Sequence, residues 1–438
     1  MKKIIRIIIS LVAVYLICLR FFPEQTLFFS NAVSDKAKDV YNEYTDTFKD
    51  KEEATNYDNM KAIWISQYDI YDMCSGGNGQ RKESDFRKAV RTAVKNICDS
   101  GFNTLFVQVR PFGDSICRSS IFPTSYIVTG DYGREAEYDV FSIILEEAKK
   151  KDLSVHAWIN PLRLMKDDEI QCIGGEYQIS KWYADDNTRG DYIVKSGERW
   201  YLNPAYSSVR EFICDGVREI FQNYDVDGIH IDDYFYPTTD ESFDSEAYGQ
   251  YVAKGGKSDL ATWRRENINS LVRELRKTTK DCCATALFGI SPAGVIDTDY
   301  NELYADVYTW GSADGYADYL CPQIYFGFEH DTCDFASVAD RWSQIVSNSN
   351  VRLIIGMSAT KAYSGIDVWA GSGKNEWAES SDILLRSLSY TLKLKNCSGA
   401  AVFSYKYMYD PLSGELQENT KDEMNNLLYL LRGIEWTK

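Results

Sequence analysis

Eight short apolar runs, each followed by an amphipathic helical pattern, constrain the fold of this 438-residue chain more than any other feature. The runs have the length and alternation of β-strands, and the segments between them repeat apolar residues with a helical period. Strand–helix alternation of this kind is typical of parallel sheets in α/β proteins. The eight runs are residues 61–69, 103–110, 153–160, 226–234, 284–291, 317–325, 351–359 and 399–407.

Eight strand–helix units predict an α/β fold, a (β/α)8 TIM barrel formed as one domain by residues 61–438. An open doubly wound sheet is the alternative, but no glycine-rich phosphate-binding turn follows the first run. Catalytic residues of such barrels lie at the carboxyl ends of the strands and in the loops that leave them. The functional site is therefore expected at that end.

The N-terminal segment has the pattern of an export signal. Three basic residues within the first six precede an apolar run from Ile7 to Leu19. Residues 1–29 are therefore predicted to be a signal-anchor that holds the protein in the cell membrane with the barrel outside the cytoplasm. Secretion after cleavage near residues 30–32 is the alternative. Residues 30–60 are charged and poor in core residues, which predicts a polar stalk.

Composition excludes several functions. The net charge is -17 and the acidic residues are spread along the chain, so no basic footprint for nucleic acid is present. With three histidines and no C-x-x-C pair, we expect no metal site and no cofactor. Most of the 11 cysteines stand singly in apolar segments, which predicts free thiols. Aromatic residues, at 14%, suit sugar stacking but suit core packing equally.

The segment DVDGIHIDDYFYP, residues 225–237, places carboxylates at the end of the fourth strand run. Alternation directs His230 and Asp232 to the same inward face, where the histidine can orient the carboxylate by hydrogen bonding. Asp233 and Tyr234 follow at the exit. Two adjacent carboxylates in an aromatic setting separate their pKa values, which divides acid and base roles in glycoside hydrolysis. Asp232 and Asp233 are the candidate catalytic pair, and an ion-pair or metal site without catalysis is the alternative.

Other strand ends supply candidate substrate contacts. The second and third runs are each expected to direct alternate polar residues into the barrel. For those in mid-strand, ordinary core packing is the competing interpretation, whereas those at the mouth favour binding. The predicted substrate-binding residues are Arg110, His156, Trp158, Asn160, His230, Tyr234, Gln323 and Tyr325.

Residues 61 to about 330 resemble the glycosyl-hydrolase-like family 10 group of bacterial barrel proteins, which is distinct from the family 10 xylanases. The resemblance implies a barrel glycosidase acting on bacterial polysaccharide, with peptidoglycan glycan strands a substrate of relatives. It also implies that Asp232 and Asp233 are active-site carboxylates lined by Arg110, Asn160 and Gln323. The matching stretches are KAIWIS, GFNTLFVQVRPFGDSICRSSIFPTSYIVTG, YDVFSIILEEAKKKDLSVHAWINPLR, WYLNPAYSSVREFICDGVREIFQNYDVDGIHIDDYFYP and DYLCPQIYF.

The fourth-strand motif DGIHID has two further likenesses. It is similar to the alpha-amylase signature, in which the aspartate in the place of Asp232 is the nucleophile and an arginine replaces His230. It is also similar to the chitinase pattern DGxDxDxE, in which a glutamate replaces Tyr234. Neither family's catalytic acid is present in this chain. The second catalytic carboxylate therefore stays open among Asp233, Asp69, Glu329 and Asp297.

The leading hypothesis is a cell-surface glycoside hydrolase of the bacterial envelope, whose partners are a polysaccharide and, through the N-terminal segment, the membrane. The alternative is a catalytically weak carbohydrate-binding or wall-scaffold protein with the same cleft. A metal-dependent polysaccharide deacetylase is disfavoured, because none of the three histidines has the spacing of metal ligands.

Overall fold

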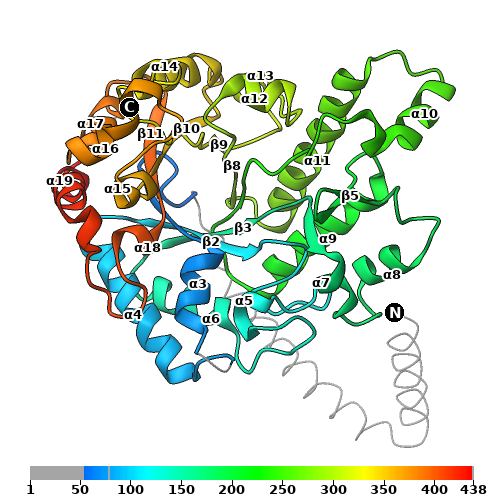
Figure 1. The fold of residues 1–438 in the computed structure, drawn as a ribbon, viewed down its shortest axis with the longest axis horizontal. Helices are drawn as coiled ribbons and strands as arrows, with labels where there is room; N and C mark the ends of the chain where they lie inside the picture. Colours follow the sequence, from blue (N-terminus) through cyan, green and yellow to red (C-terminus); the bar gives the residue numbers. More distant parts are fainter. Residues whose placement is uncertain (1–53, 77–78, 437–438) are drawn as a thin grey trace, which may run out of the picture. The chain divides into compact units, whose positions relative to one another are not determined.

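The computed structural model describes residues 54–76 and 79–436. Eight parallel strands close into a barrel in the order β1-β11-β10-β9-β8-β7-β3-β2, surrounded by helices (Figure 1). Every strand overlaps one of the predicted runs, and closure excludes the open sheet. The TIM-barrel prediction is therefore confirmed. The strands are β1 (Met60–Ile65), β2 (Thr104–Arg110), β3 (Ser154–Ile159), β7 (Gly228–Ile231), β8 (Leu287–Ile290), β9 (Tyr319–Leu320), β10 (Arg352–Ser358) and β11 (Cys397–Phe403).

Two apolar clusters stabilise the barrel. One lies between the strands and the outer helices, and the other fills the barrel interior with rings that include Trp64, Phe106, Trp158 and Tyr319. The ten cysteines of the described residues are free thiols, as predicted. The helices that return from one strand to the next are α4 (Glu83–Asp99), α6 (Val140–Lys149), α9 (Ser207–Asn223), α11 (Leu260–Cys282), α13 (Val307–Ser312), α14 (Phe335–Ile345), α17 (Ile383–Thr391) and α19 (Lys421–Leu431).

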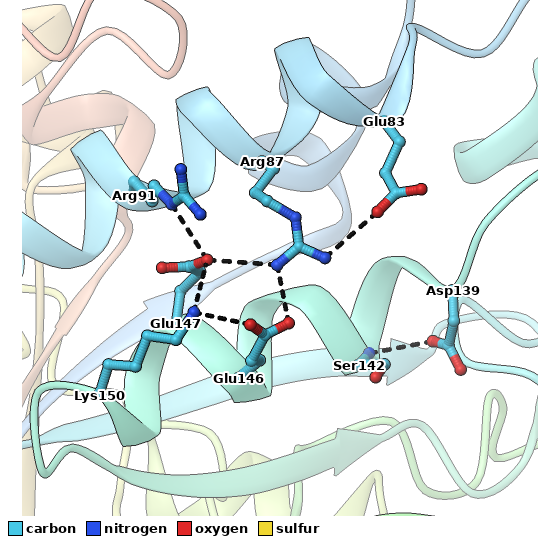
Figure 2. Close-up of polar contacts among 8 residues, drawn as sticks. All are labelled: Glu83, Arg87, Arg91, Asp139, Ser142, Glu146, Glu147 and Lys150. Carbon is cyan, nitrogen blue, oxygen red and sulfur yellow. Dashed lines mark hydrogen bonds and ion pairs between the residues drawn. The ribbon is translucent and has the colours of Figure 1, made fainter.

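An ion-pair network joins two neighbouring outer helices, α4 and α6 (Figure 2). The Glu147 carboxylate, whose side chain is 6% exposed, accepts from Arg87 at 3.3 Å, Arg91 at 3.1 Å and Lys150 at 3.2 Å. Glu146 bonds Arg87 and Lys150 at 2.7 and 2.6 Å. Because several charges share one partly buried site, the network holds the two helices more firmly than an isolated surface pair would.

The longest excursions leave the carboxyl ends of β2, β3 and β7. The excursion after β3 carries a small antiparallel sheet in the order β4-β6-β5. Long loops at this end of a barrel usually shape a binding cleft. The excursions and shorter connections contain α3 (Gln67–Cys74), α5 (Tyr126–Thr129), β4 (Arg163–Lys166), α7 (Asp167–Gln171), α8 (Gln178–Ala184), β5 (Ile193–Ser196), β6 (Arg199–Leu202), η1 (Glu241–Asp244), α10 (Ser245–Ala253), α12 (Ile296–Asn301), α15 (Thr360–Ser364), η2 (Gly371–Asn375), α16 (Glu376–Glu379), α18 (Tyr405–Met408) and η3 (Glu418–Thr420).

The predicted anchor and most of the predicted stalk lie outside the described residues. The last part of the stalk, from residue 54 on, is described and contacts the barrel. The Tyr57 hydroxyl donates to the Asn350 carbonyl at 2.5 Å, and the Thr55 hydroxyl donates to Asp227 at 3.3 Å. These two residues of the predicted stalk therefore pack against the barrel. Across the described residues, no helix combines the length and apolar character needed to span a membrane.

Candidate active site

A pocket of about 250 Å³ opens at the carboxyl ends of the barrel strands. Its wall is mostly aromatic and polar. Asp232 and Asp233 are the only carboxylates among the described residues that line it. No group of three or more potential metal-binding side chains occurs in the described part of the chain. The lining residues are Trp64, Ser66, Gln67, Tyr68, Gln108, Trp158, Arg163, Asp232, Asp233, Tyr234, Ser291, Gln323, Tyr325 and Phe403.

Asp232 is held by donors on two sides. Its Oδ2 accepts from the Trp158 indole N–H at 3.0 Å, and its Oδ1 accepts from the Tyr234 backbone N–H at 3.4 Å. The contact with Trp158 follows from strand register. Trp158 is paired with His230, so the indole reaches along the barrel to the residue that follows β7. Asp232 is only 3% exposed, so these bonds fix a carboxyl group that water barely reaches.

Asp233 is held from the opposite side of β7. The Gln323 side-chain amide donates to Asp233 Oδ1 at 2.9 Å and to the Ser291 carbonyl at 3.2 Å. Ser291 follows β8 and Gln323 follows β9, so the amide joins two strand ends to the carboxylate. The two aspartates are thus oriented by different strands although they are neighbours in sequence.

The electrostatic setting favours a protonated carboxyl group in this pocket. Burial raises the pKa of Asp232 well above its ordinary value of 3.8, and the charge of Asp233 raises this pKa further. Desolvation also raises the pKa of Asp233. The Arg163 guanidinium acts in the opposite direction on the pKa of both aspartates. Because the charge of Asp233 opposes ionisation of Asp232, Asp232 keeps its proton to a higher pH than an isolated aspartate does.

Arg163 is a site residue that the sequence analysis missed. It begins β4, immediately after the end of β3, and is the only cation among the described lining residues. Its guanidinium carbon lies 3.9 Å from the centre of the Tyr234 ring and 4.8 Å from that of Phe112. The available signal was its position, since WINPLR leaves the third strand at the barrel mouth.

Four of the predicted substrate-binding residues line the pocket: Trp158, Tyr234, Gln323 and Tyr325. Tyr234 is 43% exposed, so its side chain lies partly open to solvent. Gln108 also lines the pocket, and it donates to Asn160 Oδ1 at 2.9 Å. Asn160 is not among the described residues that line the pocket; it lies one side chain behind it and orients Gln108.

Arg110 points away from the barrel interior, so the prediction that it lines the active site is wrong. Its guanidinium lies 3.8 Å from the centre of the Phe122 ring and donates to the Gly216 carbonyl on α9 at 3.1 Å. The cause is an irregularity between β2 and β3, where Gln108 pairs with Trp158 but Arg110 pairs with Ile159. A bulge of this kind reverses the side of the sheet that the next residue faces.

His230 and His156 lie deep in the barrel, below the pocket. His230 Nε2 accepts from the Trp64 indole N–H at 3.2 Å, and both histidines bond the Tyr319 hydroxyl, at 2.9 and 2.8 Å. Burial, together with His156, holds the pKa of His230 well below its ordinary value of 6.5. The prediction that His230 orients Asp232 is therefore wrong. Neither histidine is among the described residues that line the pocket. Trp158 takes the orienting role, because its longer side chain reaches the end of β7.

Asp69 belongs to a helix capping box and is not among the described residues that line the pocket. It forms a capping box with Ser66 at the start of α3. It also accepts from the Lys406 backbone N–H at 2.6 Å. Its oxygens are thus occupied by backbone and hydroxyl donors, and its predicted role as a second catalytic carboxylate is not supported by its position.

Glu329 and Asp297 also lie away from the pocket lining. Glu329 is exposed in the segment between β9 and α14, where its backbone N–H donates to Glu376 at 2.9 Å. Asp297 is in the first turn of α12, 70% exposed, with Arg341 at 3.6 Å. Of the candidate second carboxylates, Asp233 alone shares the pocket with Asp232.

Comparisons with known proteins find similar glycosyl hydrolases. The family model described as "Glycosyl hydrolase-like 10" matches residues 59–369. "Glycosyl hydrolase DigH" of Escherichia coli (strain K12) is 31% identical over 380 residues, which cover 80% of this chain and 84% of that protein. "Glycosyl hydrolase YngK" of Bacillus subtilis (strain 168) is 29% identical over 365 residues, 79% of this chain and 68% of that protein.

Solved structures are similar in fold. The glycoside hydrolase domain of PgaB (BpsB) from Bordetella bronchiseptica superposes with a TM-score of 0.53 at 12% identity, covering 78% of this chain and 93% of that one. The catalytic domain of a beta-amylase from Paenibacillus polymyxa gives a TM-score of 0.52 at 10% identity, with 85% and 99% covered. At these identities the similarity concerns the barrel alone.

Proposed function

The chain belongs to the glycosyl hydrolase-like 10 family, and from this premise we propose that its pocket hydrolyses glycosidic bonds in a polysaccharide of the bacterial envelope. One observation carries the proposal. Asp232 and Asp233 lie together in a desolvated pocket, are oriented by different strands, and are surrounded by aromatic rings that fit the faces of sugars. Peptidoglycan glycan strands, which the sequence resemblance implies, are the first substrate to test.

The proposed chemistry uses the single proton that the aspartate pair retains. One carboxyl group donates this proton to the leaving glycosidic oxygen while the ionised one stabilises the positive charge that develops at the anomeric carbon. The C–O bond breaks and water supplies a hydroxyl group to that carbon, so the pair regains its starting protonation. Because such a pair titrates as a unit, both limbs of the pH–rate profile belong to the pair.

A carbohydrate-binding protein without hydrolysis is the second candidate. One observation favours it: both carboxylates come from the end of the same strand. In glycoside hydrolases the two catalytic carboxylates usually flank the bond that breaks. Digestion of purified glycans, including peptidoglycan with and without stem peptides, separates the two candidates. New reducing ends support hydrolysis, whereas retention of a glycan without any product supports the binding role.

Arg163→Met is expected to shift the alkaline limb of the pH–rate profile to higher pH. Arg163 lowers the pKa of both aspartates, so its removal leaves the shared proton in place up to a higher pH. Initial rates on one glycan across a pH series measure the shift. Arg218→Met, which removes an exposed surface guanidinium, is the control and should leave the profile unchanged. An alkaline limb that moves to lower pH in Arg163→Met would contradict the assignment.

We also propose that residues 1–29 anchor the protein in the membrane, as their basic and apolar pattern predicts. Full-length protein should then sediment with membranes, whereas a chain beginning at Ala54 should stay in solution and keep its fold. Fractionation followed by immunoblotting measures the distribution. If the expressed full-length gene instead yields protein in the medium that begins at Val33, the N-terminal segment is a cleaved signal.

A further inference from the structure

A row of aromatic rings leads from the pocket to the outer rim of the barrel. Tyr325 stacks on Phe403 with ring centres 6.0 Å apart, and both rings line the pocket. Phe403 lies 6.4 Å from Tyr407, which lies 5.6 Å from Tyr363. Tyr325 follows β9, Tyr363 follows β10, and Phe403 and Tyr407 are at and after the end of β11. These three strands are adjacent in the barrel (Figure 1). The row is therefore continuous along one side of the mouth.

The outer end of this aromatic row is its most exposed part. Phe403 and Tyr407 are partly buried, whereas Tyr363 is 38% exposed. A row of partly buried rings with an exposed ring at its outer end suits a chain of sugars, whose C–H faces stack on aromatic rings.

A second cavity begins where the row ends. It has a volume of about 360 Å³, and Tyr363 lines it. Its other lining residues supply hydroxyl, amide and carboxylate groups, which can bond the hydroxyl groups of a sugar. No Lys or Arg is among the described residues that line it, so it suits an uncharged unit and not an anionic one. The polar lining residues are Ser364, Ser380, Ser381, Glu418, Asn419, Asp422 and Glu423.

The active-site pocket itself is small. Its volume of about 250 Å³ lies below the roughly 300–1,000 Å³ that is usual for sites of drug-sized ligands. A polysaccharide that places one bond beside Asp232 must therefore continue outside the pocket. The aromatic row provides a surface of the right chemistry for that continuation.

We infer that the glycan chain extends from the pocket over Phe403, Tyr407 and Tyr363, and that an uncharged distal sugar occupies the second cavity. This inference rests on the proposed function and adds to it a distal subsite that binds an uncharged sugar away from the bond that breaks. Affinity should rise with chain length, and the rise should depend on the Tyr363 ring.

The test measures binding of chitin oligosaccharides, as the disaccharide and the hexasaccharide, to full-length protein carrying Asp232→Asn so that no cleavage intervenes. Adding Tyr363→Ala is expected to weaken hexasaccharide binding by about tenfold and to leave disaccharide binding unchanged. Tyr363→Phe, which keeps the ring, should restore the length dependence.

Tyr429→Ala is the matched control. Tyr429 is 85% exposed on α19. The residue after this helix, Arg432, donates to the Asp99 carbonyl at the end of α4. Because α4 leads into the start of β2, this contact lies at the end of the barrel opposite the pocket. Three results would overturn the inference: equal affinity for the disaccharide and the hexasaccharide, an equal loss of hexasaccharide affinity in the Tyr429 and Tyr363 variants, or no binding of either oligosaccharide. Hydrolysis by the native chain is scored separately. Tyr363-dependent binding without any hydrolysis rejects the enzymatic function alone, and hydrolysis without length dependence rejects the aromatic row alone.

Discussion

Replacing Asp232 by Asn is expected to lower glycan turnover by at least about a hundredfold while the fold stays intact, on the scale of losing a catalytic acid or base. Asparagine keeps the shape and can still accept the Trp158 N–H bond, but it neither holds the shared proton nor carries the charge. Initial rates of reducing-end release measure the loss. A folded Asp232→Asn protein that works at nearly the native rate would remove Asp232 from the chemistry.

The same substitution should stabilise the protein at neutral pH. Because burial raises the pKa of Asp232 in the folded state, the folded chain loses stability as pH rises through that pKa and the desolvated group ionises. Asparagine cannot ionise, so the free energy of unfolding of the variant does not fall in this way as pH rises. Asp227→Asn is the control at the other end of the strand. Asp227 accepts from the Val155 backbone N–H at 2.9 Å, so its replacement should affect stability more than rate.

Arg264→Leu is expected to lower the free energy of unfolding by about 3–5 kcal/mol, the usual result of leaving one partner of a buried ion pair alone. The Arg264 and Asp244 side chains are both 0% exposed and joined at 2.6 Å. Arg264 also donates to the Asp240 carbonyl at 2.7 Å, so it fastens the excursion after β7 to α11. Denaturant unfolding measures the change.

Two further variants test the cause of that loss. Arg264→Leu combined with Asp244→Leu should recover part of the stability, because no uncompensated charge stays buried. Arg218→Leu breaks an exposed pair with Glu211 and should cost no more than about 1 kcal/mol. A loss below about 1 kcal/mol for Arg264→Leu would show that the buried pair does not hold the excursion in place.

The barrel was predictable because strand and helix periods alternate clearly along the chain. The lengths of the individual strands were harder to predict. The sixth run was expected to cover 317–325, but β9 is only Tyr319–Leu320. Pro322 has no backbone N–H to donate to the next strand, which ends the regular pairing early. The orientation of Arg110 could not be predicted for a related reason, since a bulge depends on both paired strands.

The position of Asp232 and Asp233 was predictable from one strand, but their partners were not. Alternation placed His230 beside Asp232, yet the hydrogen bond comes from Trp158, because the register between β3 and β7 decides which side chain reaches the strand end. Asp69 looked similar to Asp232 in sequence. Its different role arises because α3 starts at Gln67, which makes Asp69 the third residue of the helix and a member of its capping box. Contacts between elements set these roles, and alternation within one element does not encode them.

Digestion of glycan strands in water labelled with oxygen-18, followed by mass spectrometry of the products, tests the proposed hydrolysis most directly. If the aspartate pair activates the glycosidic bond and water completes the reaction, each new reducing end carries one heavy oxygen atom, and Asp232→Asn forms almost none of these products. Products without the label, or tight glycan binding that yields no product at all from the native protein, would contradict hydrolysis at this pocket.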